Sequence, residues 1–329
     1  MNVAFFSTKS YDRASFDQLL PSYSHQITYF EAKLDHNSAI LAHGHEVVCA
    51  FVNDQLDKAT LKNLKNEGVK LIALRCAGYN QVDLNEAKKL GITLVRVPAY
   101  SPEAVAEHAL ALILTLSRKT HKAYNRVREN NYSIEGLTGF NLYGKTVGVI
   151  GTGAIGTAFC KIVLGLGCTV LASDPFENQK LKKLGVSFLP VKDLLKKSDI
   201  VSMHCPLTPA TKHMINKESL QLMKNGCMLI NTSRGALIET KAAIQALKIG
   251  KIGYLGIDVY EQEEDLFFQN RSEEILQDEQ IARLMTFPNV LVTGHQAFLT
   301  HEALYQIAKT TLDNLVAFEH GETLVNEVK

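Results

Sequence analysis

Three polar segments of the sequence each follow an apolar run, and each carries a side chain suited to anion binding or acid–base chemistry. They are centred on Arg234, on an acidic stretch over residues 258–265, and on His295. An arginine can hold a carboxylate through two parallel hydrogen bonds. A histidine titrates near neutral pH and can donate a proton to a reacting oxygen, and a nearby carboxylate favours its charged form. The three side-chain types together therefore indicate chemistry on a small carboxylic acid.

Each segment also has an ordinary explanation. Arg234 would serve equally as a surface salt-bridge partner, the acidic stretch as a solvated loop, and His295 as a loop residue without a task. However, parallel strands bring their carboxyl ends to one edge of a sheet. An arginine, a carboxylate and a histidine at successive strand ends beside a dinucleotide are what the reduction of a 2-keto acid requires.

A dinucleotide site is predicted by the segment that begins at Thr146. The β-branched run Thr146–Ile150 leads directly into the spacing Gly-x-Gly-x-x-Gly, and a helical stretch follows. Gly151 allows a tight turn, Gly153 allows the backbone to approach a pyrophosphate, and Gly156 allows the helix to pack close to the strand. The helix N-terminus then offers free N–H groups to the phosphates. The alternative is an ordinary tight turn without a ligand.

Asp174 strengthens the dinucleotide interpretation and selects the cofactor. It ends a second apolar run, Thr169–Ser173, roughly 20 residues beyond the glycines, where a carboxylate can accept hydrogen bonds from ribose hydroxyls. Such a carboxylate repels a 2′-phosphate, and no arginine follows within residues 175–178. The sequence therefore predicts NAD and not NADP.

Apolar runs alternate with helical stretches along most of the chain, which predicts an α/β fold with two doubly wound parallel-sheet domains and a cleft between them. We assign residues 1–100 plus 299–329 to a substrate (catalytic) domain and residues 101–298 to an NAD-binding domain. The predicted strands are Val3–Phe6, Gln26–Phe30, Val47–Val52, Val69–Leu74, Thr93–Val97, Thr146–Ile150, Thr169–Ser173, Ile200–His204, Met228–Asn231, Leu255–Val259 and Val290–Thr293.

One long helix is predicted between the two domains. It covers Ala104–Lys119, with Asn130 as its outer limit, and its apolar composition predicts burial between domains or subunits. His108 lies within it and is interpreted as a packing residue, because a catalytic group belongs at a strand end. A final helix over Thr300–Glu319 would return the chain to the first domain.

Composition narrows the class of protein. The net charge of +1 gives no reason to expect binding to nucleic acid or to an anionic membrane. The longest apolar segment, Ala109–Leu116, is too short to span a bilayer. The six cysteines are scattered without a Cys-x-x-Cys spacing, which is typical of reduced residues and not of disulfides or a zinc site. We expect a cytoplasmic protein with no metal and no secretion signal.

These motifs resemble the D-specific 2-hydroxy acid dehydrogenase family, and most closely its D-lactate branch. The resemblance covers nearly the whole chain and rests on segments 144–156, 204–209, 231–238, 258–263 and 294–298. It implies a flavodoxin-like substrate domain, a Rossmann domain that binds NAD, and reduction of pyruvate to D-lactate by NADH. It also implies a homo-oligomer, a dimer or larger.

The resemblance further implies a set of site residues. The catalytic set is Arg234, Glu263 and His295, with Glu263 as the acid and not Glu261 or Glu264. Cofactor contacts are implied for Gly151, Gly153, Ala154, Ile155, Gly156, Asp174, Cys205, Pro206, Thr211, Thr232, Ser233 and Asp258. Substrate contacts are implied for Ala77, Gly78, Tyr100, Arg234 and Phe298. For Cys205, and for His204 before it, we expect contact or bracing without chemistry.

Two departures bear on the substrate. Many members of the family have a proline directly after the catalytic glutamate and another directly before the histidine, where this chain has Glu264 and Gly294. A longer segment, residues 265–287, also separates the two motifs, and both features look like the D-lactate branch. Two alternatives stay open: a related dehydrogenase acting on glyoxylate, hydroxypyruvate or a branched 2-keto acid, and a non-catalytic NAD-sensing protein on the same fold.

Overall fold

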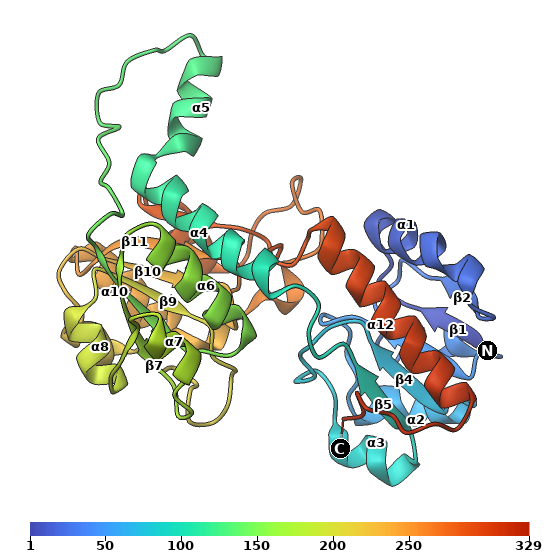
Figure 1. The fold of residues 1–329 in the computed structure, drawn as a ribbon. Helices are drawn as coiled ribbons and strands as arrows, with labels where there is room; N and C mark the ends of the chain where they lie inside the picture. Colours follow the sequence, from blue (N-terminus) through green and yellow to red (C-terminus); the bar gives the residue numbers. More distant parts are fainter. Residues whose placement is uncertain (329) are drawn as a thin grey trace. The chain divides into compact units, whose positions relative to one another are not determined.

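The protein is seen here as a computed structural model that describes residues 1–328, with the exception of the side chain of Asp265. It forms two compact units (Figure 1). The N-terminal unit comprises Met1–Ser101 and the segment that starts at Leu299, and the central unit comprises Pro102–Phe298. The functional assignment of 1–100 plus 299–329 and of 101–298 remains a prediction, and Lys329 lies outside the described residues.

The N-terminal unit is built on a five-stranded parallel sheet with strand order β2-β1-β3-β4-β5. Its strands are β1 (Asn2–Phe5), β2 (Gln26–Tyr29), β3 (Val47–Ala50), β4 (Leu71–Leu74) and β5 (Thr93–Arg96). Its helices are α1 (Ser10–Leu19), α2 (Lys58–Asn66), α3 (Leu84–Leu90) and α12 (His301–Glu319), with short 3-10 turns η1 (Leu20–Ser22) and η2 (Ser38–Ala42).

The C-terminal helix α12 completes the core of this unit. Its residues Ala308, Leu312 and Leu315 are buried in one cluster with Val3 and Phe5 of β1. Strands β3 and β4 are buried along their whole length, as expected for parallel strands covered on both faces. The chain therefore returns to its first unit at the end, as the sequence predicted.

The central unit is built on a seven-stranded parallel sheet with strand order β12-β11-β10-β9-β6-β7-β8. Its strands are β6 (Thr146–Ile150), β7 (Thr169–Ser173), β8 (Ser187–Phe188), β9 (Ile200–Met203), β10 (Cys227–Asn231), β11 (Ile252–Ile257) and β12 (Val290–Val292). Its helical elements are α4 (Pro102–Arg118), α5 (Thr120–Arg128), α6 (Ala154–Gly165), α7 (Gln179–Lys183), α8 (Val191–Lys197), α9 (Lys217–Leu222), η3 (Gly235–Leu237), α10 (Thr240–Lys248), η4 (Glu263–Asp265) and α11 (Glu279–Met285).

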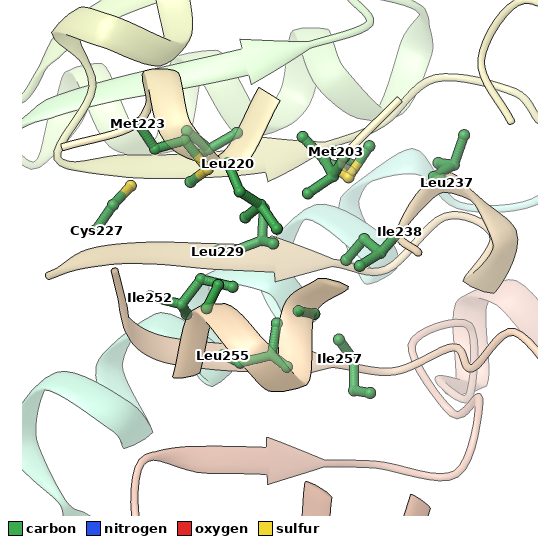
Figure 2. Close-up of a cluster of buried hydrophobic side chains, with 14 of the residues drawn as sticks. Met203, Leu220, Met223, Cys227, Leu229, Leu237, Ile238, Ile252, Leu255 and Ile257 are labelled. Atoms are coloured by element: carbon green, nitrogen blue, oxygen red, sulfur yellow. The ribbon is translucent and has the colours of Figure 1, made fainter. Parts of the chain in front are cut away.

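Helices cover both faces of the central sheet, so each face has its own apolar cluster. One cluster joins the sheet to α4 and α6, and the other joins it to helices α8 to α11. Figure 2 shows residues of the second cluster, among them Leu220, Leu229 of β10, and Leu255 and Ile257 of β11. This packing fixes the two strands whose carboxyl ends carry most of the predicted catalytic residues. The predicted class, two parallel-sheet α/β domains, is confirmed.

Some predicted boundaries were wrong. The long helix stops at Arg118, because Lys119 adopts a left-handed conformation (φ +53°), and α5 begins as a separate helix. The apolar face of α4 packs on α6 and the sheet within its own unit, which is the structural reason for its composition. Strand β11 begins at Ile252, three residues before the predicted start, and the two-residue β8 was not predicted because it is too short to give a pattern.

Candidate active site

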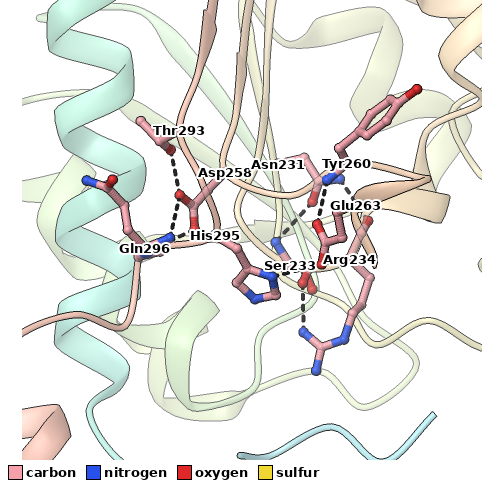
Figure 3. A network of polar contacts seen from close by, with 10 residues as sticks. Asn231, Ser233, Arg234, Asp258, Tyr260, Glu263, Thr293, His295 and Gln296 are labelled. Carbon is pink, nitrogen blue, oxygen red and sulfur yellow. Dashed lines mark hydrogen bonds and ion pairs between the residues drawn. The ribbon is translucent and has the colours of Figure 1, made fainter. Parts of the chain in front are cut away.

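Three neighbouring strands of the central sheet bring Arg234, Glu263 and His295 to one edge. Strands β10, β11 and β12 are adjacent and parallel, and each of the three side chains follows the carboxyl end of one of them. Figure 3 shows the three side chains gathered beyond these strand ends. The convergence expected from the order of the segments is therefore present within one unit.

Glu263 and His295 form a hydrogen-bonded pair. The Oε1 atom of Glu263 lies 2.8 Å from Nδ1 of His295, and its Oε2 atom accepts a hydrogen bond from the backbone N–H of Tyr260 at 2.7 Å. Their side chains are 19% and 16% exposed, which is enough for a substrate to reach the imidazole. Because Nδ1 faces the carboxylate, Nε2 is the nitrogen that can face a substrate.

Asp258 fixes the loop that carries the imidazole. Its buried carboxylate accepts hydrogen bonds from Thr293 Oγ1 (2.5 Å), Gln296 N (2.9 Å) and Ala297 N (2.8 Å). Its backbone oxygen accepts from the backbone N–H of His295, which is held at φ +55°. Burial raises the pKa of Asp258, but the hydrogen bonds that it accepts outweigh burial and hold the pKa below its ordinary value. The sequence analysis did not identify this clamping role.

His108 of α4 also contacts the residues that fix this loop. Its Nε2 lies 3.1 Å from Thr293 Oγ1 and 3.4 Å from Asp258 Oδ1, and its side chain is largely buried. It therefore has the structural position that was expected for it, with the addition of a polar contact to the strand-end loop.

The backbone around Arg234 is fixed, whereas its side chain is not held by an acid. Asn231 Nδ2 donates to the Arg234 carbonyl (2.8 Å), and the guanidinium donates to the carbonyl of Ser233 (2.7 Å). Among the described residues, no carboxylate lies within ion-pair distance of this guanidinium. The interpretation of Arg234 as a salt-bridge partner thus has no support, and its positive charge stays available for an anion.

The glycines of the dinucleotide motif have different environments. A Cβ at Gly156 would lie 2.0 Å from the carbonyl oxygen of Gly151, and a Cβ at Gly151 would lie 2.6 Å from the carbonyl of His204. A Cβ at Gly153 would meet nothing within 4 Å. Gly151 and Gly156 therefore serve packing, whereas the space beside Gly153 is open to a ligand. Ala154 and Ile155 form the start of α6 at the edge of this space.

Asp174 lies against the glycine loop. Its Oδ2 accepts from the backbone N–H of Thr152 (2.6 Å) and from Thr152 Oγ1 (3.0 Å), while Oδ1 accepts from the backbone N–H of Phe176 (2.8 Å). The carboxylate predicted to recognise a ribose is thus held next to the loop predicted to hold the pyrophosphate.

The remaining predicted cofactor contacts follow β9 and β10. Ser233 Oγ donates to the carbonyl of Cys205 (2.6 Å), so the two strand ends are joined. Thr211 Oγ1 donates to the carbonyl of Pro206 (2.7 Å), and Thr232 is buried beside Ser233. Burial raises the pKa of the Cys205 thiol to about 11, which is consistent with a packing role without chemistry.

His204 lies directly beside the glycine loop. Its Nδ1 is buried, its Nε2 lies 2.8 Å from Ser202 Oγ, and its ring packs on Phe159 with a centroid distance of 4.8 Å. Burial lowers the pKa of His204 to about 3, so this side chain is neutral at physiological pH. It braces the strand end, as expected.

In the N-terminal unit, the loop after β4 carries two of the predicted substrate contacts. Cys76 Sγ donates to the carbonyl of Gly78 (3.2 Å), and Arg96 donates to the carbonyl of Ala77 (2.8 Å). Tyr100 lies near the end of this unit's first segment, and Phe298 is a buried residue at the end of the central unit. These contacts belong to different units from one another, and their approach to a substrate stays a prediction.

Arg75 anchors this loop and was not singled out from the sequence. Its guanidinium lies over the rings of Phe5 (4.3 Å) and Phe51 (4.7 Å) and is fully buried. It donates to the carbonyl of Ser7 (2.9 Å) and to Asp12 (3.3 Å). A buried arginine with these partners makes the loop start rigid.

Two further features are absent from the described residues. No group of histidine, cysteine, aspartate and glutamate side chains among them is arranged to hold a metal ion. No helix among them is long and apolar enough to cross a membrane.

The chain is similar in sequence and in fold to known proteins. The family model "D-isomer specific 2-hydroxyacid dehydrogenase, NAD binding domain" matches residues 110–297. The chain is 52% identical over 328 residues to the D-lactate dehydrogenase of Escherichia coli, and the match covers 100% of both chains. The solved apo-structure of the E. coli D-lactate dehydrogenase is similar at a TM-score of 0.92, with 50% identity and 100% coverage of both chains. A structure of the pyruvate reductase of Chlamydomonas reinhardtii is similar at a TM-score of 0.95, with 45% identity over 99% of this chain and 98% of that one.

Proposed function

Because this chain belongs to the D-isomer specific 2-hydroxyacid dehydrogenase family, we propose that it is an NAD-dependent D-lactate dehydrogenase that reduces pyruvate to D-lactate. The observation that carries the proposal is the hydrogen-bonded pair of Glu263 and His295 at the same strand edge as Arg234. Relatives that are named D-lactate dehydrogenase and pyruvate reductase support the choice of substrate.

The residues of the glycine loop fit an NAD molecule. Open space beside Gly153 leaves room for a pyrophosphate, and the first turn of α6 offers its N–H groups to that anion. The carboxylate of Asp174 would accept hydrogen bonds from ribose hydroxyls in place of those that it now accepts from Thr152. The residues after β9 and β10, among them Cys205 and Ser233, would border the rest of the cofactor.

In the proposed reaction, bound NADH would supply a hydride to the keto carbon of pyruvate, and this chain would supply the proton that completes D-lactate. The guanidinium of Arg234 grips the substrate carboxylate through two parallel hydrogen bonds. Nε2 of His295 donates its proton to the carbonyl oxygen as negative charge develops there. The carboxylate of Glu263 orients the imidazole through Nδ1 and stabilises its protonated form. In the reverse direction His295 accepts the hydroxyl proton of D-lactate.

Selection of a small substrate is assigned to bulky side chains. Tyr100 and Phe298 would leave room only for a short side chain on the 2-keto acid, and Ala77 and Gly78 would offer backbone contacts. Because these four residues belong to two different units, their roles are tested by measuring the activity of variants in which each of them is replaced.

Two alternatives are kept. A dehydrogenase for glyoxylate, hydroxypyruvate or a branched 2-keto acid would use the same three catalytic residues with a different side-chain preference. A non-catalytic NAD-sensing protein would bind NADH without turnover, although the presence of Arg234, Glu263 and His295 argues against it.

The deciding experiment is NADH oxidation with pyruvate and a panel of small 2-keto acids, followed by chiral analysis of the product. We expect D-lactate, a preference for pyruvate, and a much lower kcat/KM with NADPH. An L-product, or NADH binding without oxidation of any substrate in the panel, would reject the proposal.

We also propose a cytoplasmic homo-oligomer. The segment over residues 119–143, which we call the arm, includes α5, which has no buried residue. Tyr132 and Ile134 in the arm are 71% and 82% exposed, and exposed apolar side chains of this kind favour association. Sedimentation of the protein and of a Tyr132→Asp, Ile134→Asp variant tests this: a monomeric parent would contradict it.

A further inference from the structure

An aromatic side chain outside the predicted site packs against the ring of the candidate catalytic histidine. The ring of Phe268 is centred 5.5 Å from the ring of His295, with an interplanar angle of 39°. This distance is within the range in which aromatic rings attract one another. The imidazole is therefore contacted at Nδ1 by Glu263, and its ring packs against that of Phe268.

The segment that carries Phe268 is attached to the core on both sides of the contact. Leu266, Phe267 and Leu276 pack against the apolar cluster that supports β10 and β11. The backbone N–H groups of Leu266 and Phe267 both donate to the carbonyl of Glu263, at 3.0 and 2.9 Å. Phe268 follows directly, so its position is tied to that of the carboxylate that orients His295.

Side-chain hydrogen bonds join the two ends of the same segment. The hydroxyl of Tyr260 donates to Asp278 (2.8 Å) and to Gln262 (3.1 Å), and Asp278 is also the N-cap of α11. The segment between Gln262 and Asp278 is thus anchored at both ends. The aromatic contact is a consequence of this anchoring and not of a freely moving loop.

Both partners in the contact have a strained backbone. Phe268 has φ +64° and His295 has φ +55°, a region that residues other than glycine rarely adopt. Such conformations persist only where the surrounding structure holds them, and they occur often at functional sites. The contact between Phe268 and His295 therefore joins two residues that both have a positive φ.

We propose that Phe268 is a positioning residue for His295. Its ring limits the rotation of the imidazole, so that Nδ1 stays on the Glu263 carboxylate and Nε2 points at the substrate. This inference rests on the proposed reaction but adds a residue to it. Phe268 does not touch the reacting atoms and acts only through His295.

Other charged groups near the imidazole are the same in all test variants. They are Glu263 at Nδ1, the carboxylate of Asp258 that binds the His295 loop, His108 beside Asp258, and the guanidinium of Arg234 beyond the end of β10. A change in pH dependence on replacing Phe268 therefore reports the loss of the aromatic contact.

The test compares Phe268→Leu and Phe268→Tyr with the parent protein. Phe188→Leu is the matched control, because Phe188 is also half-buried in the central unit but packs on the opposite cluster. For Phe268→Leu we expect kcat for pyruvate reduction to fall roughly tenfold. The alkaline limit of kcat/KM should move to lower pH, because an imidazole that is no longer held in place hydrogen-bonds less well to the Glu263 carboxylate. The Kd for NADH should stay at the parent value.

Phe268→Tyr should restore both quantities, since it keeps the ring, and Phe188→Leu should lower thermal stability without moving the pH profile. Parental kcat and pH profile in Phe268→Leu, or equal changes in Phe188→Leu, would overturn the inference.

NMR titration of the imidazole Cε1–H signals, with His295 assigned from a His295→Gln spectrum, separates this inference from the proposed reaction. If the parent fails to oxidise NADH, the reaction is wrong. The inference then stands or falls on whether Phe268→Leu, and not Phe188→Leu, shifts or broadens the Cε1–H signal of His295.

Discussion

The Oε1 atom of Glu263 lies 2.8 Å from Nδ1 of His295, although 32 residues separate them in the chain. The second carboxylate oxygen is held by the backbone N–H of Tyr260, so the carboxylate cannot rotate away without losing that bond. One nitrogen of the imidazole is thereby fixed, and the other is left for the substrate. The following predictions use this geometry and that of the cofactor loop.

Replacing His295 with glutamine should remove the proton donor and leave the fold intact. We expect kcat for pyruvate reduction to fall by about 10²–10⁴, the range found for a lost general acid. The Kd for NADH, measured by fluorescence, should change little. His301→Gln, at an exposed position, is the control for loss of a histidine. A kcat within a few fold of the parent would mean that another group donates the proton.

Glu263→Gln should preserve the hydrogen bond to Nδ1 but remove the negative charge. Because the protonated imidazole then loses its ionic partner, the alkaline limit of pyruvate reduction should move to lower pH, with activity retained at low pH. The pH profile of kcat/KM is the measurement. Glu264→Gln, which changes the neighbouring exposed carboxylate, should leave the profile where it is. If Glu263→Gln and Glu264→Gln give the same pH profile, the pair of Glu263 and His295 has no role in catalysis.

Arg234→Lys should weaken pyruvate binding, because an ammonium cannot form two parallel hydrogen bonds to a carboxylate. We expect KM for pyruvate to rise roughly tenfold or more, with little change in KM for NADH. Arg271→Lys is a matched control, since Arg271 is paired with Glu274 in the solvent. A parental KM for pyruvate in Arg234→Lys would reject the carboxylate-binding role.

Two alanine substitutions in the glycine loop should have opposite effects. Gly153 has φ −60° and no atom within 4 Å of an added Cβ, so Gly153→Ala should keep the parental Tm but bind NADH more weakly. In Gly156→Ala the new Cβ would meet the carbonyl of Gly151 at 2.0 Å, so the Tm should fall by several degrees. Thermal unfolding and NADH titration of both variants distinguish the two roles. Undiminished NADH affinity in Gly153→Ala would show that the open space is not used.

Acid should destabilise the protein through His204. Its pKa is about 3 when folded and about 6.5 when unfolded, so between these values the unfolded chain binds more protons. The stabilisation is complete above pH 6.5 and is lost as the pH falls toward 3, by about 2 kcal/mol at pH 5. Between pH 7.5 and pH 5, the free energy of unfolding measured in urea should fall less in His204→Gln than in the parent protein, by about this amount. An unchanged difference would place the acid sensitivity in other groups.

Local patterns in the sequence predicted much of the architecture. The strands over Thr146–Ile150 and Thr169–Ser173 have the predicted bounds, because a short apolar run that ends at a glycine turn or at a polar residue is a local signal. The break at Lys119 was missed because a left-handed lysine leaves no sign in composition. The edge strand β8 was missed because two residues carry no period.

The sequence by itself determined that an arginine, an acid and a histidine follow neighbouring strands beside a glycine loop, since chain order and strand spacing fix which loops share a sheet edge. It did not determine from these residues which acid meets the imidazole. The fold decides this: Glu263 binds His295, whereas Glu261 binds His213 (2.6 Å) and Thr240.

The tertiary structure alone likewise brought Phe268 onto His295 and buried Arg75 between two phenylalanine rings. Contacts of this kind depend on how distant segments pack, and packing distances of a few ångströms are set by the whole core and not by the spacing of residues along the chain.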